Sequence, residues 1–165
     1  MLDTAALIRK HKGRGVLVDS NLLVLFLVGS VNRKRVQVFK RTRDFSLDEF
    51  DVLKALISHF GLPVIVTPHV LSQVSDLADL DGPDFGSIRI ALKELVENSH
   101  EHYDPAKLLI SNPVFDRLGL ADAGIAVAAS LGKVILTVDL NLHIALEKLG
   151  IESINFRHVS PLGLF

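Results

Sequence analysis

Three short runs of aliphatic residues, each followed by a helical pattern, constrain the fold of this chain more than any other feature. The runs are Val16–Val18, Val64–Val66 and KVILTVD, residues 133–139. Each has the β-branched and aliphatic composition of a strand. Strands that alternate with helices at this spacing predict an α/β domain with a parallel sheet.

The clearest helix is expected at SLDEFDVLKALISHFG, residues 46–61. Ser46 and Glu49 have the spacing of a capping box, and Gly61 is placed to end the helix. Thr67, followed by proline, has the features of a second helix start. Further helices are expected at residues 21–28, 68–77, 88–99, 121–132 and 142–149, and further strands at residues 107–110 and near Ile154.

The composition indicates one globular domain, expected to span residues 1–165. Hydrophobic residues make up 48% of the chain, and the net charge of -1 gives no overall basic excess for nucleic-acid binding. The absence of cysteine excludes disulfides and thiolate metal sites and favours a cytoplasmic location. The apolar run at residues 22–31 is much shorter than the roughly 20 residues of a membrane span, so no membrane partner is expected.

Three aspartates are expected to meet at one edge of the sheet. Asp19 follows the first strand, Asp139 ends the run at residues 133–139, and Asp122 lies at the start of a helix. In an open parallel sheet, ligands bind beyond the carboxyl ends of the strands, where the strand order reverses. A single aspartate after a strand is usually a helix cap or a turn residue, but three at matching edges favour a shared site.

A cluster of carboxylates needs a positive partner. Two of them about 4 Å apart repel by roughly 4 kcal/mol at an effective dielectric constant near 20. Arg117 and Lys133 are the only basic residues near Asp122 or Asp139 in the sequence. We therefore expect Mg²⁺ or Mn²⁺, which bind one or two carboxylates and keep several waters. Such an ion lowers the pKa of a bound water and neutralises charge on a phosphoryl oxygen.

Three motifs then suggest a family. VLVDSN, LGLADAGIAVAA and GKVILTVDLNL followed by LGIESINF resemble, in order and spacing, motifs of the PIN-domain nucleases, which include the VapC-type toxins. The resemblance implies a three-layer fold with a parallel five-stranded sheet flanked by helices, a divalent metal ion and hydrolysis of RNA phosphodiester bonds. It assigns Asp19, Asp122 and Asp139 to metal binding and catalysis, supported by Asn21 and Thr137. Family members often pair with an antitoxin protein and form homodimers, so both are partner hypotheses.

One position departs from the family pattern. The second acid of the family is typically a glutamate on the helix after the second strand, and the stretch TPHVLSQVSDL has Gln73 there. A neutral amide can bind a metal or a water but supplies neither charge nor a base. Two hypotheses stay open: a metal-dependent endoribonuclease that works with three acids or is helped by Asp76, and a weakened or inactive RNA-binding or interaction module.

The run RKRVQVFKRTR, residues 33–43, is the one concentrated basic stretch. Its side chains could contact RNA phosphates, which position a strand without reading its sequence, or could form an ordinary solvated surface. Histidines at positions 69 and 143 follow strand ends near the expected site, whereas HEH at residues 100–102 fits a polar helix end. The basic residues of the run are Arg33, Lys34, Arg35, Lys40, Arg41 and Arg43.

Two other classes of α/β protein are disfavoured. Neither GxGxxG nor a P-loop follows any expected strand, which argues against enzymes that use nucleotide cofactors. The first strand ends in DSN rather than the DxD of aspartyl phosphatases, and no acidic pair precedes it as in receiver domains.

Overall fold

The strands form one parallel sheet in the computed structural model, which describes residues 3–159. The order is β3-β2-β1-β4-β5, and every neighbouring pair is parallel. The first strand is central, with Leu17 opposite Ile65 on one side and Ile135 on the other. The predicted α/β class with a five-stranded parallel sheet is therefore confirmed. The strands are β1 (Val16–Val18), β2 (Val64–Val66), β3 (His100–Glu101), β4 (Val134–Thr137) and β5 (Ser153–Asn155).

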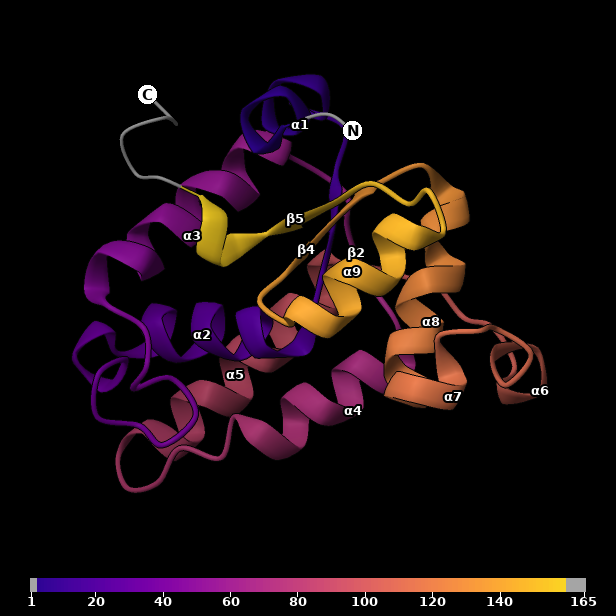
Figure 1. The fold of residues 1–165 in the computed structure, drawn as a ribbon. Helices are drawn as coiled ribbons and strands as arrows, with labels where there is room; N and C mark the ends of the chain where they lie inside the picture. Colours follow the sequence, from indigo (N-terminus) through magenta and orange to yellow (C-terminus); the bar gives the residue numbers. More distant parts are fainter. Residues whose placement is uncertain (1–2, 160–165) are drawn as a thin grey trace.

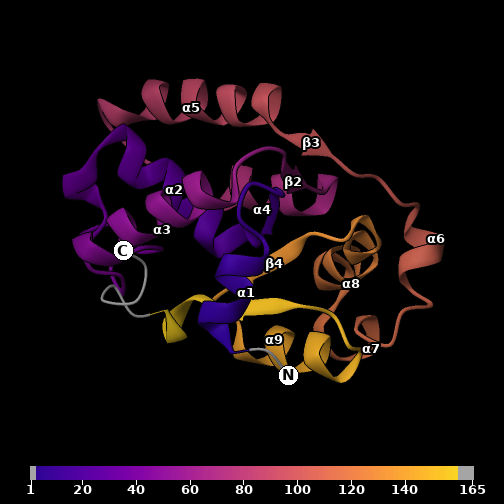
Figure 2. The same ribbon diagram turned by 90° about the horizontal axis from the view of Figure 1, so that it is seen from above.

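Helices cover both faces of the sheet (Figure 1). Seen from above, α2 and α5 lie on one side of the strands and α9 on the other, with α5 outside α2 (Figure 2). Within the described residues, none of the helices combines the length and apolar character that crossing a membrane would require. The helices are α1 (Thr4–Lys10), α2 (Ser20–Val31), α3 (Leu47–Phe60), α4 (Pro68–Leu77), α5 (Asp84–Asn98), α6 (Ala106–Leu109), α7 (Phe115–Leu118), α8 (Leu120–Ala128) and α9 (Leu140–Lys148).

The predicted helix starts are present. Ser46 accepts from the Glu49 N–H at 3.0 Å and donates its own N–H to the Glu49 carboxylate at 2.8 Å, which completes the capping box of α3. Gly61 ends α3 with φ at 68°, a conformation that glycine adopts without a steric penalty. Thr67 caps α4 by accepting from the Val70 N–H. Local hydrogen bonding therefore sets these boundaries.

The central helix α2 packs closely against α3. It is buried almost all round, as expected of a helix that lies between the sheet and α5. At Gly29 an added Cβ would lie 2.3 Å from the Phe50 ring, so only glycine allows this approach. The close contact sets the separation of α2 and α3 at this point.

The third strand is not where the sequence predicts it. Residues 107–110 were expected as a strand, but Ala106–Leu109 forms α6. The third strand is His100–Glu101, in the stretch expected to end a helix. Both its residues are exposed at the sheet edge, so the strand carries no apolar pattern, and its pairing with β2 alone defines it.

Candidate active site

Asp19 lies between β1 and α2 and is buried, with 4% of its surface exposed. Its side chain caps α2 by accepting from the Asn21 N–H at 3.0 Å, and it also accepts from the Ser20 hydroxyl at 3.3 Å. The other carboxylate oxygen accepts a short hydrogen bond from the hydroxyl of Thr137, the last residue of β4. A buried carboxylate at this strand end is therefore held from three directions.

Thr137 links Asp19 to Asp139. Its hydroxyl donates to the Asp19 carboxylate and accepts from the Asp139 N–H at 3.0 Å. The Asp139 carboxylate in turn caps α9, accepting from the N–H groups of Asn141 and Leu142 at 2.8 and 3.1 Å. The ends of β1 and β4 are thereby joined through one buried hydroxyl.

Asp122 is the third acid of the group. It lies in the first turn of α8, is partly buried, and forms no hydrogen bond among the described side-chain contacts. Burial, the Asp19 carboxylate and the Asp139 carboxylate together raise the pKa of Asp122 to about 7. Because the two other acids act on it, the three carboxylates lie in one electrostatic neighbourhood, at the edge where the sequence places them.

The environment of Asp19 also disfavours its charged form. Burial raises its pKa most, and Asp139 adds to the rise, whereas the hydrogen bonds from Thr137, Asn21 and Ser20 act in the opposite direction. A bound cation would act against the effect of burial, because an opposite charge nearby favours the charged form of a carboxylate.

The three acids have no salt-bridge partner in the part of the chain that the structure describes. Among the ion pairs within residues 3–159, none includes Asp19, Asp122 or Asp139. Oxygen donors without a basic partner are the ligands that hard divalent cations prefer. The same part of the chain contains no group of three His, Asp or Glu side chains arranged to hold one metal ion. A hard cation that takes one or two carboxylates and keeps several waters would not need such a group.

The other two residues expected to support the acids differ in their roles. Asn21 is exposed at the start of α2, and its backbone N–H is the group that contacts Asp19. Gln73 is exposed on α4, about 9 Å further along the helix axis than Thr67 at the sheet edge. Asp76, one turn later, is also exposed. Neither Gln73 nor Asp76 forms a hydrogen bond or ion pair with the three acids within residues 3–159.

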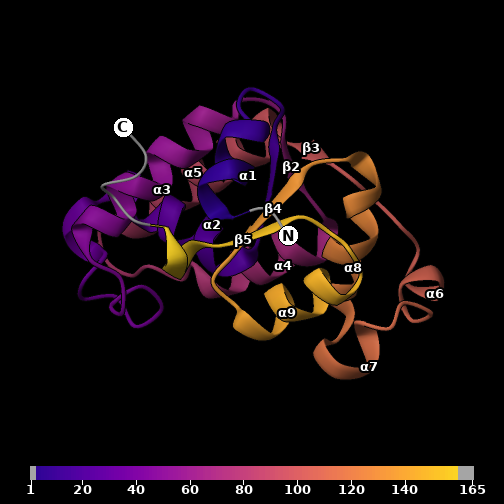
Figure 3. The ribbon, with the colours of Figure 1, turned by 45° about the horizontal axis from the view of Figure 1, so that its top comes forward.

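The basic run lies at the far end of α2. This helix has 12 residues, so about 18 Å separates the run from Asp19 along its axis. Figures 1 and 3 both show the segment that follows α2 at the opposite end of the molecule from α8.

Acidic residues pair with half of the run. Arg33 contacts Asp51 at 2.7 Å and Lys40 contacts Asp79 at 3.0 Å. Arg35 contacts two aspartates at 2.7 and 3.7 Å. The other three basic residues of the run are exposed and form no ion pair within residues 3–159; they are Lys34, Arg41 and Arg43.

A histidine and an aspartate at the end of β3 were missed by the sequence reasoning. The His102 N–H donates to the Val66 carbonyl at 2.8 Å, which continues the pairing of β3 with β2. The His102 ring contacts Asp104 at 2.9 Å, and both line a small hollow with His69. In the sequence, HEH at residues 100–102 is the one pattern that includes His102. It fits a polar helix end, so it does not predict that His102 lies beside the sheet edge.

His143 is held by structural contacts. Its Nδ1 lies 2.8 Å from the Ser153 hydroxyl, and its Nε2 lies 3.4 Å from the Glu147 carboxylate in the next turn of α9. Ser153 is buried in β5, so this arrangement links α9 to the sheet and presents no exposed nucleophile.

No family model, curated protein or solved structure matches this chain. The similarity of its motifs to the PIN-domain nucleases therefore stays a prediction from the sequence.

Proposed function

We propose that this protein is a PIN-like ribonuclease that uses Mg²⁺ or Mn²⁺ to hydrolyse RNA phosphodiester bonds. The observation that carries the proposal is the link between Asp19 and Asp139 through the Thr137 hydroxyl at the ends of β1 and β4, with Asp122 in the first turn of α8 close enough to act on both charges. None of the three forms an ion pair within residues 3–159. The cysteine-free composition supports a cytoplasmic location for this activity. An antitoxin or a second copy of the chain would be the regulatory partner of such an enzyme.

Each acid has a separate role in the proposed reaction. Asp19 and Asp139 would hold the cation, which supplies a water of lowered pKa and neutralises charge on the phosphoryl oxygen. Asp122, which is partly buried in the first turn of α8 and accepts no hydrogen bond within residues 3–159, would accept the proton of the attacking water. Thr137 positions Asp19 through its hydroxyl.

The test is cleavage of mixed RNAs by the purified protein in Mn²⁺. We expect Asp19→Asn to reduce the rate at least about 100-fold, because losing even a group that only supports a metal ligand costs about 10- to 100-fold in metal affinity or activity. Asp48→Asn is the matched control, since Asp48 is an exposed aspartate on α3 outside the site. Equal activity of wild type and Asp19→Asn would contradict the proposal, because a contaminating nuclease would then be responsible.

The alternative is an RNA-binding or interaction module without catalysis. Gln73 favours it, because this exposed side chain supplies no fourth acid. Under this alternative the wild type binds RNA without cutting it, and Gln73→Glu gains Mn²⁺-dependent cleavage. Efficient cleavage by the wild type would exclude the alternative.

A further inference from the structure

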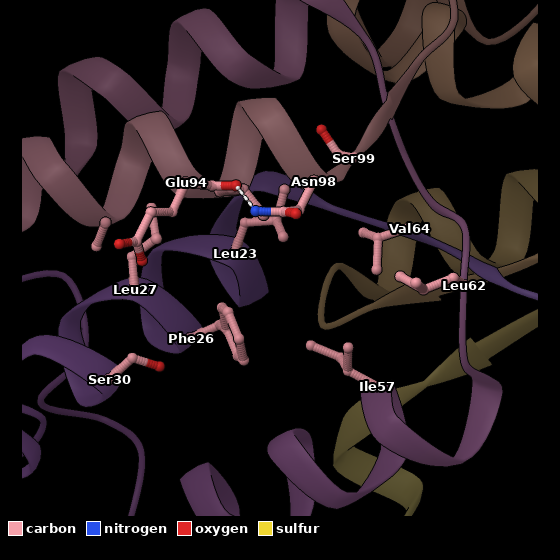
Figure 4. Close-up of a pocket in the computed structure, with 12 residues that line it drawn as sticks. Leu23, Phe26, Leu27, Ser30, Ile57, Leu62, Val64, Glu94, Asn98 and Ser99 are labelled. Atoms are coloured by element: carbon pink, nitrogen blue, oxygen red, sulfur yellow. Dashed lines mark hydrogen bonds between the residues drawn. The ribbon is translucent and has the colours of Figure 1, made fainter.

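A cavity of about 310 Å³ opens between α2, α3, α5 and the start of β2. None of the three acids lines it, so it is separate from the proposed active site. Figure 4 shows side chains from these elements bordering one common space. The apolar side chains of its wall include Leu23, Phe26, Leu27, Ile57, Leu62 and Val64.

The size and lining of this cavity are those of a small-molecule site. Protein interiors are packed with few voids larger than one water molecule. Ligand sites are mostly apolar pockets of roughly 300–1,000 Å³, and this cavity lies at the lower end of that range. Leu62 at its border is 74% exposed, so an apolar surface stands in water there. An occupant with an apolar body would remove this surface from water.

The polar border of the cavity is acidic. Glu94, Asn98 and Ser99 border it at the end of α5, and no lysine or arginine lines it. The Asn98 side chain donates to the Glu94 backbone carbonyl at 2.8 Å, as Figure 4 shows. The Glu94 carboxylate takes part in no ion pair within residues 3–159. A negative charge thus borders the apolar space without a positive partner in that part of the chain.

We propose that this cavity binds a small amphiphilic amine, with its aliphatic body between α2 and α3 and its ammonium group at Glu94. The apolar lining selects the body through burial of hydrocarbon. The carboxylate selects the head group, since it attracts a cation and repels an acid. A fatty acid with the same alkyl chain as the amine would place its carboxylate next to that of Glu94, so the two negative charges would repel. A neutral alcohol would leave Glu94 unpaired.

The test compares three ligands with one alkyl chain, octylamine, 1-octanol and octanoate, by isothermal titration calorimetry at low salt. We expect saturable one-to-one binding of octylamine. Its affinity should exceed that of octanol by about 3- to 5-fold, the effect of one solvent-exposed ion pair. Octanoate should bind more weakly than either.

Two kinds of variant separate the cavity from its charge. Ala91 lines the cavity, so Ala91→Phe should fill it and abolish binding of all three ligands; Ala91→Leu serves the same purpose if the phenylalanine prevents folding. Glu94→Gln should make octylamine and octanol bind equally. Glu97→Gln is the matched control, because Glu97 is exposed on the same helix and does not line the cavity.

Several results would overturn the proposal. They are the absence of saturable octylamine binding, octanoate binding as tight as that of octylamine, or full binding by a folded Ala91 variant. Self-association that is lost in Ala91→Phe, without octylamine binding by the wild type, would assign the cavity to a second copy of the chain. Because Asp19→Asn should leave octylamine binding unchanged, failure of the nuclease proposal is distinguishable from failure of this one.

Discussion

Thr137 shows at the residue scale how one buried hydroxyl organises two acids. It donates to Asp19 and accepts from the Asp139 N–H, so both hydrogen-bonding functions of the hydroxyl are used at once. Asp122, which has no such donor, has its pKa raised to about 7. Within residues 3–159, the cluster therefore contains two carboxylates that accept hydrogen bonds, Asp19 and Asp139, and one that accepts none, Asp122.

Replacing Thr137 by valine keeps the shape of the side chain and removes its hydroxyl. The Asp19 carboxylate then loses a buried donor, and we expect a loss of about 1–3 kcal/mol in the free energy of unfolding at pH 7. Urea unfolding monitored by circular dichroism measures this loss. Thr137→Ser should retain most of the stability. Equal stability of the valine variant and wild type would show that the bond contributes nothing.

Asp122 makes stability depend on pH in a direction that can be worked out. Its pKa rises from 3.8 in the unfolded chain to about 7 in the folded protein. The folded state therefore binds this proton more tightly, and stability falls as pH rises from about 4 to 7, with the loss complete above pH 7. The pKa shift corresponds to a loss of at most about 4 kcal/mol in the free energy of unfolding, and the partial exposure of Asp122 makes this loss smaller.

Asp122→Asn should remove this pH dependence. We expect the variant to be more stable than wild type by about 2 kcal/mol at pH 8 and equally stable at pH 4, because Asp122 is neutral at the lower pH. Thermal unfolding across this pH range provides the comparison. A variant whose stability follows the wild-type pH profile would place Asp122 away from the other acids.

The elements differ in how strongly local sequence defines them. Helices α3 and α4 begin at side-chain caps, and the sequence pattern predicted both. Strand β3 has two exposed residues and no apolar pattern, so its register with β2 is the only feature that makes it a strand. Its position also determines where His102 and Asp104 lie, and for that reason this pair was missed.

The packing of α2 against α3 can be tested by mutation. Gly29→Ala would place a methyl group 2.3 Å from the Phe50 ring. We expect a destabilisation of about 1–3 kcal/mol, the usual cost of overpacking. The double variant with Phe50→Leu should recover part of it, and a double-mutant cycle by urea unfolding measures the coupling. Strictly additive effects would show that the two helices do not meet at these residues.

Charge is distributed unevenly over the whole molecule. Within residues 3–159, Asp19, Asp122 and Asp139 form no ion pair, whereas half of the basic run at the other end of α2 is paired with aspartates. RNA bound at the acidic edge would reach this run only if it extended along the length of α2.

Cation binding should stabilise the whole fold. If Mg²⁺ binds only the folded state, a Mg²⁺ concentration of about 100 times the Kd adds about 2.7 kcal/mol to the free energy of unfolding. At pH 8 we expect Mg²⁺ to raise the Tm of the wild type and to leave that of Asp19→Asn unchanged, with NaCl of equal ionic strength as the control. An equal rise in both proteins would locate the binding outside the three acids.

The sequence by itself determined the strands β1, β2 and β4, the capped helices and the edge at which the three aspartates meet. It did so because aliphatic composition and helix caps act over a few residues, and because parallel strands direct their carboxyl ends to one side. The tertiary structure alone decided the place of β3, the bridging role of Thr137 and the pairing of half of the basic run with aspartates. These depend on partners far apart in the chain, such as Asp19 with Thr137 and Arg35 with Asp81, and no local pattern records such distances.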